Sequence, residues 1–293
     1  MSMATNKEQA LLEDPTTLLI SGVPPAGLLP NAGQLAQALD DIRRGLAQWR
    51  LWTALGLYEI RLRYRRTSLG PFWMTFNLGL TISLAGLVFG VLFKVRAETY
   101  LPHLASGLVM WFAITATLGE ASRCYVDAGH CIKQIKRPLS VYILVVVWRN
   151  FIVFLHNLLI VPVVLLVFLI PPGWPMAVAP LMILLSFLTL LPYGLIIAVA
   201  GARFRDIPQV VANILASLFF ISPIVWKIEL LGEHAPFAYI NPFTHMLEIV
   251  RLPLLGQWMP AMSVLVVIGL AILGWLMAIL VFARFRARLA YWV

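Results

Sequence analysis

Few side chains in this sequence have the type and spacing that catalysis requires. None of the five lysines follows a glycine as in the phosphate-binding Walker sequence, so we expect no ATP site of that kind. The five histidines and the two cysteines, Cys124 and Cys131, are not spaced as metal ligands or as a redox pair, although His130 adjoins Cys131. The sequence therefore predicts no catalytic residues, no metal and no cofactor bound by this chain.

Two charged residues inside long apolar segments are more informative. Glu120 lies in the segment 104–125, and Arg149 lies eight residues into the segment 141–170. An ionisable side chain within a bilayer is costly unless it is paired or functional. Because the two segments are consecutive, we predict an intramembrane charge pair between Glu120 and Arg149. A structural clamp is the simpler interpretation, and contact with a headgroup or substrate is the alternative.

Arginines gather just before the first long apolar segment. They are Arg61, Arg63, Arg65 and Arg66. A planar guanidinium matches the oxygens of a phosphate group, so this cluster could bind a pyrophosphate. Attraction to ordinary anionic lipids is the other interpretation. Because Arg61 and Arg65 are four residues apart, we expect them to share one face of a helix.

Aromatic side chains form a third group. At a membrane interface they serve as an aromatic belt, and inside helices they fill the packing between neighbours. Flat aromatic faces can also stack on the C–H faces of sugar rings. The candidates for such stacking are Trp73, Phe76, Phe219, Phe220, Trp226, Tyr239 and Phe243.

The composition indicates the kind of fold that positions these groups. Hydrophobic residues make up 61% of the 293 residues and charged residues 12%, against roughly 45–50% and 25% in globular domains. A water-exposed surface needs more polar side chains than this chain has, and disorder, a coiled coil and a disulfide scaffold are also excluded. We predict an all-α, polytopic membrane protein.

Six apolar segments are long enough to be transmembrane helices, which need about 20 residues each. They lie at 72–93, 104–125, 141–170, 176–200, 207–226 and 262–282. The segment 227–261 is too apolar for an ordinary loop and too rich in proline to span the membrane, so it predicts re-entrant helices between spans five and six. An even number of spans places both termini on one side.

The distribution of positive charge predicts which side that is. Of the 22 lysines and arginines, 17 lie on the side of the termini, four lie on the other side, and Arg149 lies within a span. Positive charge is retained on the cytoplasmic side, so both termini are predicted to be cytoplasmic. This distribution also explains the net charge of +9 without a nucleic-acid partner.

The N-terminal region precedes the spans. Residues 1–33 predict a flexible cytoplasmic tail rather than a cleaved signal, because acidic residues and prolines interrupt it. Residues 34–68 predict an amphipathic helix at the membrane interface, with an apolar stripe from Leu35 to Trp49 and charged residues such as Asp41 and Arg43 on the remaining surface. A helix packed on a water-soluble partner is the alternative.

Four short motifs follow one another on this topology. They read RYRRTSLGPFW at 63–73, CIKQIKRPL at 131–139, RFRDIP at 203–208 and NPFTHMLEIVR at 241–251, and Ser222-Pro223 also fits. Through them the chain resembles the permease subunits of polysaccharide and O-antigen ABC exporters, which are type-2 ABC transporters. The resemblance covers residues 58–285 and implies a six-span membrane domain at 69–285 followed by a cytoplasmic tail at 286–293.

The resemblance also implies partners and site residues. A second copy of the chain and two ABC ATPase subunits, which hold the ATP and Mg, would complete an exporter in the bacterial inner membrane. Its substrate would be a polysaccharide linked to polyprenyl pyrophosphate, reaching the channel from among the membrane lipids beside Arg61, Arg63, Arg65 and Arg66. The residues implied in coupling to the ATPase are Lys133, Gln134, Ile135, Lys136, Arg137, Arg203, Arg205 and Asp206.

Three other functions are compatible with a polytopic, basic chain. A type-2 exporter of small lipophilic drugs would share the fold but need a narrower, less aromatic pathway. An intramembrane glycosyl- or acyltransferase would need paired acids or an aspartate-rich metal motif, and the sequence has neither. A passive channel or scaffold would leave the coupling-type loop at 131–139 unexplained.

Overall fold

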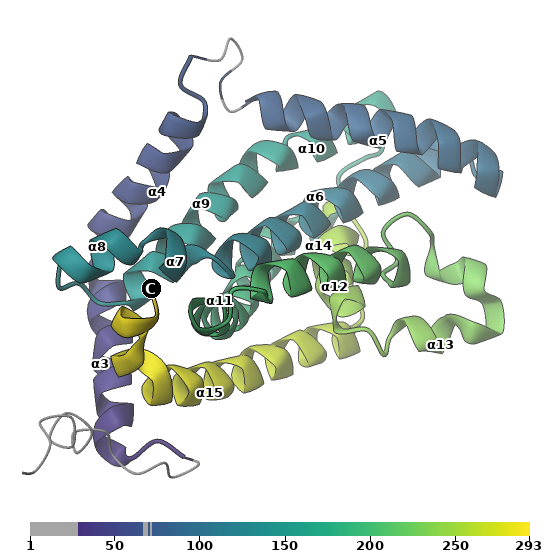
Figure 1. The fold of residues 1–293 in the computed structure, drawn as a ribbon. Helices are drawn as coiled ribbons and strands as arrows, with labels where there is room; N and C mark the ends of the chain where they lie inside the picture. The colour runs from purple at the N-terminus through teal and green to yellow at the C-terminus, as the bar shows by residue number, and fades with distance from the viewer. Residues whose placement is uncertain (1–28, 67–69, 71) are drawn as a thin grey trace, which may run out of the picture.

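The fold of the chain is all-helical (Figure 1). The computed structural model describes residues 29–66, 70 and 72–293, and within these ranges no strand occurs. This confirms the predicted all-α class. Most of the predicted N-terminal tail, residues 1–28, lies outside the described residues, as do residues 67–69 and 71 of the first motif.

Two helices precede the long ones and run across their ends (Figure 1). The first, α3 (Ala32–Ala47), begins with a capping box in which Asn31 and Gln34 exchange hydrogen bonds between side chain and backbone. The second, α4 (Trp49–Arg63), follows after a break at Gln48 and packs along α9. Two helices therefore replace the single helix expected at 34–68, and the interfacial position stays a prediction.

The end of α4 overturns one prediction. The helix ends at Arg63, so Arg65 lies beyond its last turn and does not share a helix face with Arg61. The backbone at Arg66 has φ 70°, a left-handed conformation that an α-helix does not contain. The chain therefore turns before it enters the first span.

Five helices of the described chain are long and apolar enough to cross a membrane. They are α5 (Phe72–Phe93), α6 (Ala97–Ala121), α9 (Ser140–Leu158) continued by α10 (Ile160–Val167), the 3₁₀ turn η1 (Trp174–Val178) continued by α11 (Ala179–Arg203), and α15 (Ala261–Trp292). The first coincides with the predicted segment 72–93. The last continues past Phe282 to Trp292, so the predicted tail at 286–293 is mostly the end of a helix.

The helix at the predicted fifth span is shorter than expected. It is α12 (Ile207–Ile221), with 15 residues, whereas a span of the hydrocarbon core takes about 20. It ends where Ser222 adopts an extended backbone before Pro223, because proline disfavours the helical conformation in the preceding residue. Beyond it come η2 (Ile228–His234), α13 (Ala235–Ala238) and α14 (Pro242–Leu254).

Short helices occupy opposite ends of the bundle. The helices α7 (Cys124–Asp127) and α8 (Gly129–Gln134) lie at the end that also holds α3 and the C-terminus, whereas η2 and α13 lie at the far end (Figure 1). The helix α14 packs against α6, α11 and α15. Close approach between the ends of α6 and α11 depends on Gly201, where a Cβ atom would lie 1.8 Å from the carbonyl oxygen of Ser122.

Candidate functional site

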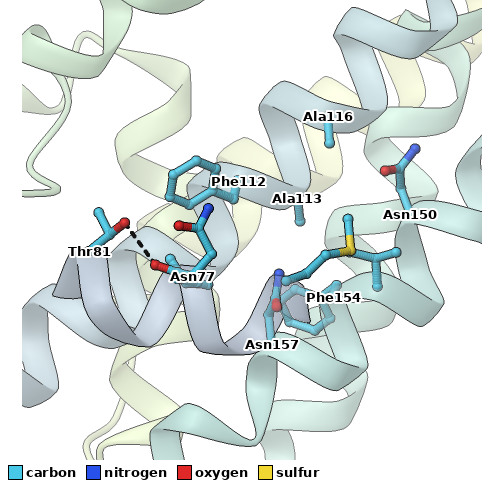
Figure 2. Close-up of a pocket in the computed structure, with 11 residues that line it drawn as sticks. Asn77, Thr81, Phe112, Ala113, Ala116, Asn150, Phe154 and Asn157 are labelled. Carbon is cyan, nitrogen blue, oxygen red and sulfur yellow. Dashed lines mark hydrogen bonds between the residues drawn. The ribbon is translucent and has the colours of Figure 1, made fainter. Parts of the chain in front are cut away.

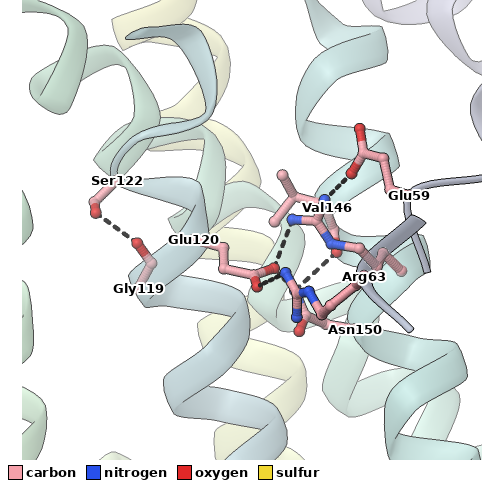
Figure 3. Close-up of polar contacts among 8 residues, drawn as sticks. Glu59, Arg63, Gly119, Glu120, Ser122, Val146 and Asn150 are labelled. Carbon is pink, nitrogen blue, oxygen red and sulfur yellow. Dashed lines mark hydrogen bonds and ion pairs between the residues drawn. The ribbon is translucent and has the colours of Figure 1, made fainter. Parts of the chain in front are cut away.

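A cluster of alternating charges joins α4, α6 and α9 (Figure 3). Glu120 accepts hydrogen bonds from Arg149 Nη2 at 2.6 Å and Arg63 Nη2 at 3.0 Å through different carboxylate oxygens. Asn150 Nδ2 also donates to Glu120, at 2.6 Å, and Arg149 forms a second ion pair with Glu59. These five residues form what we call the charged cluster, and they bring the predicted partners Glu120 and Arg149 into direct contact.

The charged cluster is only partly shielded from its surroundings. The side chain of Arg149 is 13% exposed and that of Glu120 is 21% exposed, whereas that of Arg63 is 44% exposed. Burial alone would lower the pKa of Arg63, but its hydrogen bond to Glu120 and the charge of that carboxylate outweigh burial and raise it. Arg63 therefore stays charged at the outer limit of the cluster.

A cavity of ≈ 390 Å³ adjoins the charged cluster. Its wall includes four arginines and three acids from α4, the end of α6, α7, the 131–139 loop and α9. The ionisable residues of this wall are Glu59, Arg63, Glu120, Arg123, Asp127, Arg137 and Arg149. An excess of guanidinium groups next to a helix that lies across the spans is a suitable environment for a phosphate group.

The structure separates the arginines that the sequence groups together. Only Arg63 lies in the wall of this cavity, while Arg61, Arg65 and Arg66 are exposed outside it. The sequence reasoning missed Arg123, Asp127 and Glu59. Of these, Glu59 carries a readable signal, because it precedes Arg63 by four residues on the same helix.

The residues implied in ATPase coupling that lie on or just after α8 are at the same end of the bundle as α3 and the C-terminus (Figure 1). The turn between α11 and α12 is near the C-terminus too, because Arg203 contacts Trp292. All but Arg137, which is half-buried in the cavity wall, are exposed: Lys133, Gln134, Ile135, Lys136, Arg203, Arg205 and Asp206. The guanidinium of Arg203 lies over the rings of Phe204 and Trp292, at 5.7 and 5.4 Å. The exposed members form a basic surface that includes α8 and the turn between α11 and α12.

The predicted position of Asp41 in the N-terminal helix is wrong. The sequence predicts a solvent-facing position, but the residue is 2% exposed. Its carboxylate accepts hydrogen bonds from the backbone N–H groups of Leu139 and Ser140 at 3.1 and 3.0 Å, and from Arg286 Nε at 2.8 Å. One side chain therefore joins α3 to the start of α9 and the end of α15.

The predicted aromatic platforms have different environments. Trp73 and Phe76 stack on each other at 5.5 Å and are exposed on α5. Phe219 and Phe243 instead pack against Trp111, at 6.1 and 5.7 Å, which supports the helix-packing interpretation for these two.

The other three candidates lie between the end of α12 and the start of α14. Phe220 is 76% exposed at the end of α12. The Trp226 indole donates to the carbonyl of Phe220 at 2.9 Å, and the Tyr239 hydroxyl donates to Glu248 at 3.0 Å. Of the seven candidates, Trp73, Phe76, Phe220 and Tyr239 are exposed enough for a ring face to stack on a sugar.

Two further cavities lie among the long helices. The first, of ≈ 190 Å³, is bordered by Asn77, Asn150 and Asn157 on α5 and α9, with Phe112 of α6 (Figure 2). Asn157 accepts a hydrogen bond from Thr75 at 3.3 Å, so its amide helps to join α5 to α9. The second, of ≈ 410 Å³, is almost wholly apolar and lies between α11, α12, α14 and neighbouring helices.

Comparison with known proteins adds a family and two relatives. Residues 50–255 match the family described as ABC-2 type transporter, and this stretch is more than half of the chain. The chain is similar to the O-antigen export system permease protein RfbA of Myxococcus xanthus, with 24% identity over 193 residues, 66% of this chain and 74% of the relative. The protein of the same name from Klebsiella pneumoniae is 25% identical over 196 residues, 64% of this chain and 74% of the relative.

Proposed function

Because the chain belongs to the ABC-2 type transporter family, we propose that it is the permease subunit of an exporter for O-antigen-type polysaccharide. The observation that carries this proposal is its similarity to two permeases of O-antigen export systems over about two thirds of its length. The five long apolar helices supply the membrane-spanning part that such a subunit needs.

The cavity beside the charged cluster suggests how a lipid-linked substrate is recognised. A polyprenyl-pyrophosphate headgroup is a dense anion, and Arg63 and Arg137 reach this cavity from the interfacial helix α4 and the 131–139 loop. Glu120 pairs with both Arg63 and Arg149, and Arg63 is the more exposed of the two arginines. In this proposal, Arg63 exchanges part of its contact with Glu120 for a phosphate oxygen while Arg149 keeps the carboxylate in place.

The proposed topology has six spans, with α12 as the fifth and η2 to α14 as the re-entrant segment. The membrane would be the inner membrane of a bacterium. Both termini and the basic surface that includes α8 would face the cytoplasm, in agreement with the 17 positive charges on that side. Two copies of the chain would enclose the channel, and two ATPase subunits holding ATP and Mg would dock on the basic surface. This subunit contributes no catalytic group.

A deletion and complementation experiment tests the proposed function. Removing the gene from its host should stop display of the polysaccharide at the cell surface and cause lipid-linked polysaccharide to accumulate inside. Restoring the wild-type gene should reverse both effects. Surface polysaccharide at the parental level in the deletion strain would contradict the proposal.

One observation favours a second candidate, the export of small lipophilic compounds. The ≈ 410 Å³ cavity has a wall that is apolar except for Thr189 and Tyr193 and has the size of a small-molecule site. If this candidate is correct, deletion should raise sensitivity to lipophilic compounds and leave surface polysaccharide unchanged. The same deletion strain therefore distinguishes the two functions.

A further inference from the structure

A pocket of ≈ 510 Å³ lies between the first turns of α6, the η2–α13 segment and α14. The η2–α13 segment is at the end of the bundle opposite α3 and the C-terminus (Figure 1). In the proposed orientation the pocket therefore opens on the outer side. Its volume falls within the range of about 300–1,000 Å³ that is usual for sites binding small molecules.

A buried arginine forms part of the pocket wall. Arg251 of α14 is 3% exposed, and its Nη2 donates to the carbonyl oxygen of Pro223 at 2.7 Å. The guanidinium lies against Gly107 of α6, where a Cβ atom would come within 2.3 Å of Nη2. Its Nε has no hydrogen-bond partner among the residues that the structure describes. A guanidinium carries five N–H donors, and the one on Nε is left for another acceptor.

An oriented acceptor lies one helical turn earlier. Glu248 accepts a hydrogen bond from the Tyr239 hydroxyl at 3.0 Å on one carboxylate oxygen and from the Ser263 hydroxyl at 2.8 Å on the other. Burial is the larger cause that raises the pKa of Tyr239 to about 12, and the negative charge of Glu248 is the second. The phenol therefore stays protonated and donates the hydrogen bond. Each carboxylate oxygen keeps a lone pair for another donor.

The remaining charges favour an uncharged ligand. Glu98 and Glu229 are exposed, Lys227 is half-buried and Arg251 is buried, so an approaching anion meets two carboxylates before it reaches the guanidinium. A metal is also disfavoured, because no three His, Cys, Asp or Glu side chains of the described chain are grouped closely enough to hold one. Fixed donors and acceptors at close spacing suit a ligand that carries many hydroxyl groups.

We propose that this pocket is a binding subsite for one neutral sugar unit of the exported polysaccharide. Arg251 would donate to one hydroxyl and Glu248 would accept from its neighbour, while Gln257 offers an amide that can do either. This inference rests on the proposed function, because the transported polysaccharide supplies the sugar. It places a specificity-determining contact in the segment between α12 and α15.

The test uses the full-length chain in lipid nanodiscs and methyl glycosides of glucose, galactose, mannose and N-acetylglucosamine as separate probes. Saturation-transfer NMR should detect binding of at least one glycoside. Ala235 lines the pocket, so Ala235→Trp should fill it and weaken that binding at least about tenfold. Glu233→Trp adds the same side chain two residues away, outside the pocket, and should leave binding unchanged.

A further variant guards against misfolding of Ala235→Trp. Gln257→Leu alters an exposed side chain that the proposal places on the sugar, and it should weaken glycoside binding without loss of the folded state. Equal binding by Ala235→Trp and Glu233→Trp would overturn the inference. So would wild-type protein that binds no glycoside, or that binds phosphorylethanolamine in the pocket instead, which would assign it to a lipid headgroup.

The export assay separates this inference from the proposed function. Surface polysaccharide that depends on the gene, together with no glycoside binding, would remove the subsite and leave the proposed function standing. Glycoside binding that Ala235→Trp abolishes, together with export that does not depend on the gene, would remove the proposed function and support the pocket as a sugar site.

Discussion

Arg149 is the residue on which the charged cluster depends. It contacts two carboxylates, those of Glu59 and Glu120, and its own side chain is mostly buried. A buried charge that loses its partner costs far more free energy than a surface charge that does so. The pairing therefore fixes the position of α4 relative to α6 and α9, and thereby the shape of the cavity beside it.

Replacing Glu120 by Gln should destabilise the folded protein by about 1.5–3 kcal/mol, because Arg149 keeps Glu59 but loses its other charged partner, and the more exposed Arg63 loses its own. A thermal unfolding measurement in detergent would detect this as a clear fall in Tm. The control is Glu98→Gln, whose pair with Arg96 is exposed and should contribute about 0–1 kcal/mol. Equal Tm values for the two variants would show that the charged cluster contributes no more than a surface pair.

Replacing Arg63 by Lys tests the recognition of pyrophosphate. Lysine keeps the charge but loses the planar fork that pairs with phosphate oxygens. We expect export to fall at least about tenfold, or roughly 1.4 kcal/mol of binding. Arg61→Lys is the matched control on the same helix, because that side chain is exposed and outside the cavity wall. Similar export by both variants would leave the arginines as general attractants for anionic lipid.

The contact between Glu120 and Arg149 could be predicted from the sequence, but the rest of the charged cluster could not. Two consecutive apolar segments are usually adjacent in space, and opposite charges at similar depths within them then tend to pair. Glu59 and Arg123 join the cavity only because α4 lies along α9 and because the chain turns after α6. That information is in tertiary packing, which no periodicity in the sequence expresses.

At the scale of the elements, too, the sequence predicted some features and missed others. The apolar segment 72–93 predicted the bounds of α5, since no charged residue and no proline interrupts it. The stripe from Leu35 to Trp49 indicated a helix, but it did not indicate which residues pack on the bundle. The buried residues of α3 are Ala38, Asp41 and Gly45, which are small or hydrogen bonded, and Leu39 is 50% exposed. Apolar residues left outside suit a helix at a lipid interface.

Asp41 should be the most sensitive position of α3. Replacing it by Ala leaves the first N–H groups of α9 without their acceptor and leaves Arg286 without its carboxylate. We expect a loss of at least about 1–2 kcal/mol from the missing cap alone. Limited proteolysis should then cleave the end of α15 sooner than in the wild type. Asp40→Ala removes only an exposed pair with Arg44 and should not change that rate.

The orientation of the whole molecule can be measured by cysteine labelling. The background is a chain with Cys131→Ser, which removes the exposed native thiol. One cysteine at a time is then placed at Glu98, Glu233 or Trp258, or at Gln134 or Asp206. The first three should react with an impermeant thiol reagent in spheroplasts, and the last two only after permeabilisation. The opposite pattern would reverse the orientation, and with it the placement of the ATPase.

The whole molecule is also expected to assemble with an ATPase subunit. The basic surface holds Lys133 and Lys136 on or just after α8, both exposed at the end of the bundle where α3 and the C-terminus lie. Neither lies in the wall of the cavity beside the charged cluster. Reversing both to Glu should therefore leave the permease folded. Because charges across an interface mainly set association, the double variant should release the ATPase subunit and stop export.

Co-purification of the ATPase with the tagged permease measures that effect directly. The matched control is the double reversal Lys94→Glu and Arg96→Glu, which places the same change in charge between α5 and α6 at the opposite end. It should retain the ATPase as the wild type does. Since the variants differ only in the end of the bundle that is altered, loss of the ATPase from the control alone would place the docking surface at the other end. Retention by both variants would exclude Lys133 and Lys136 from it.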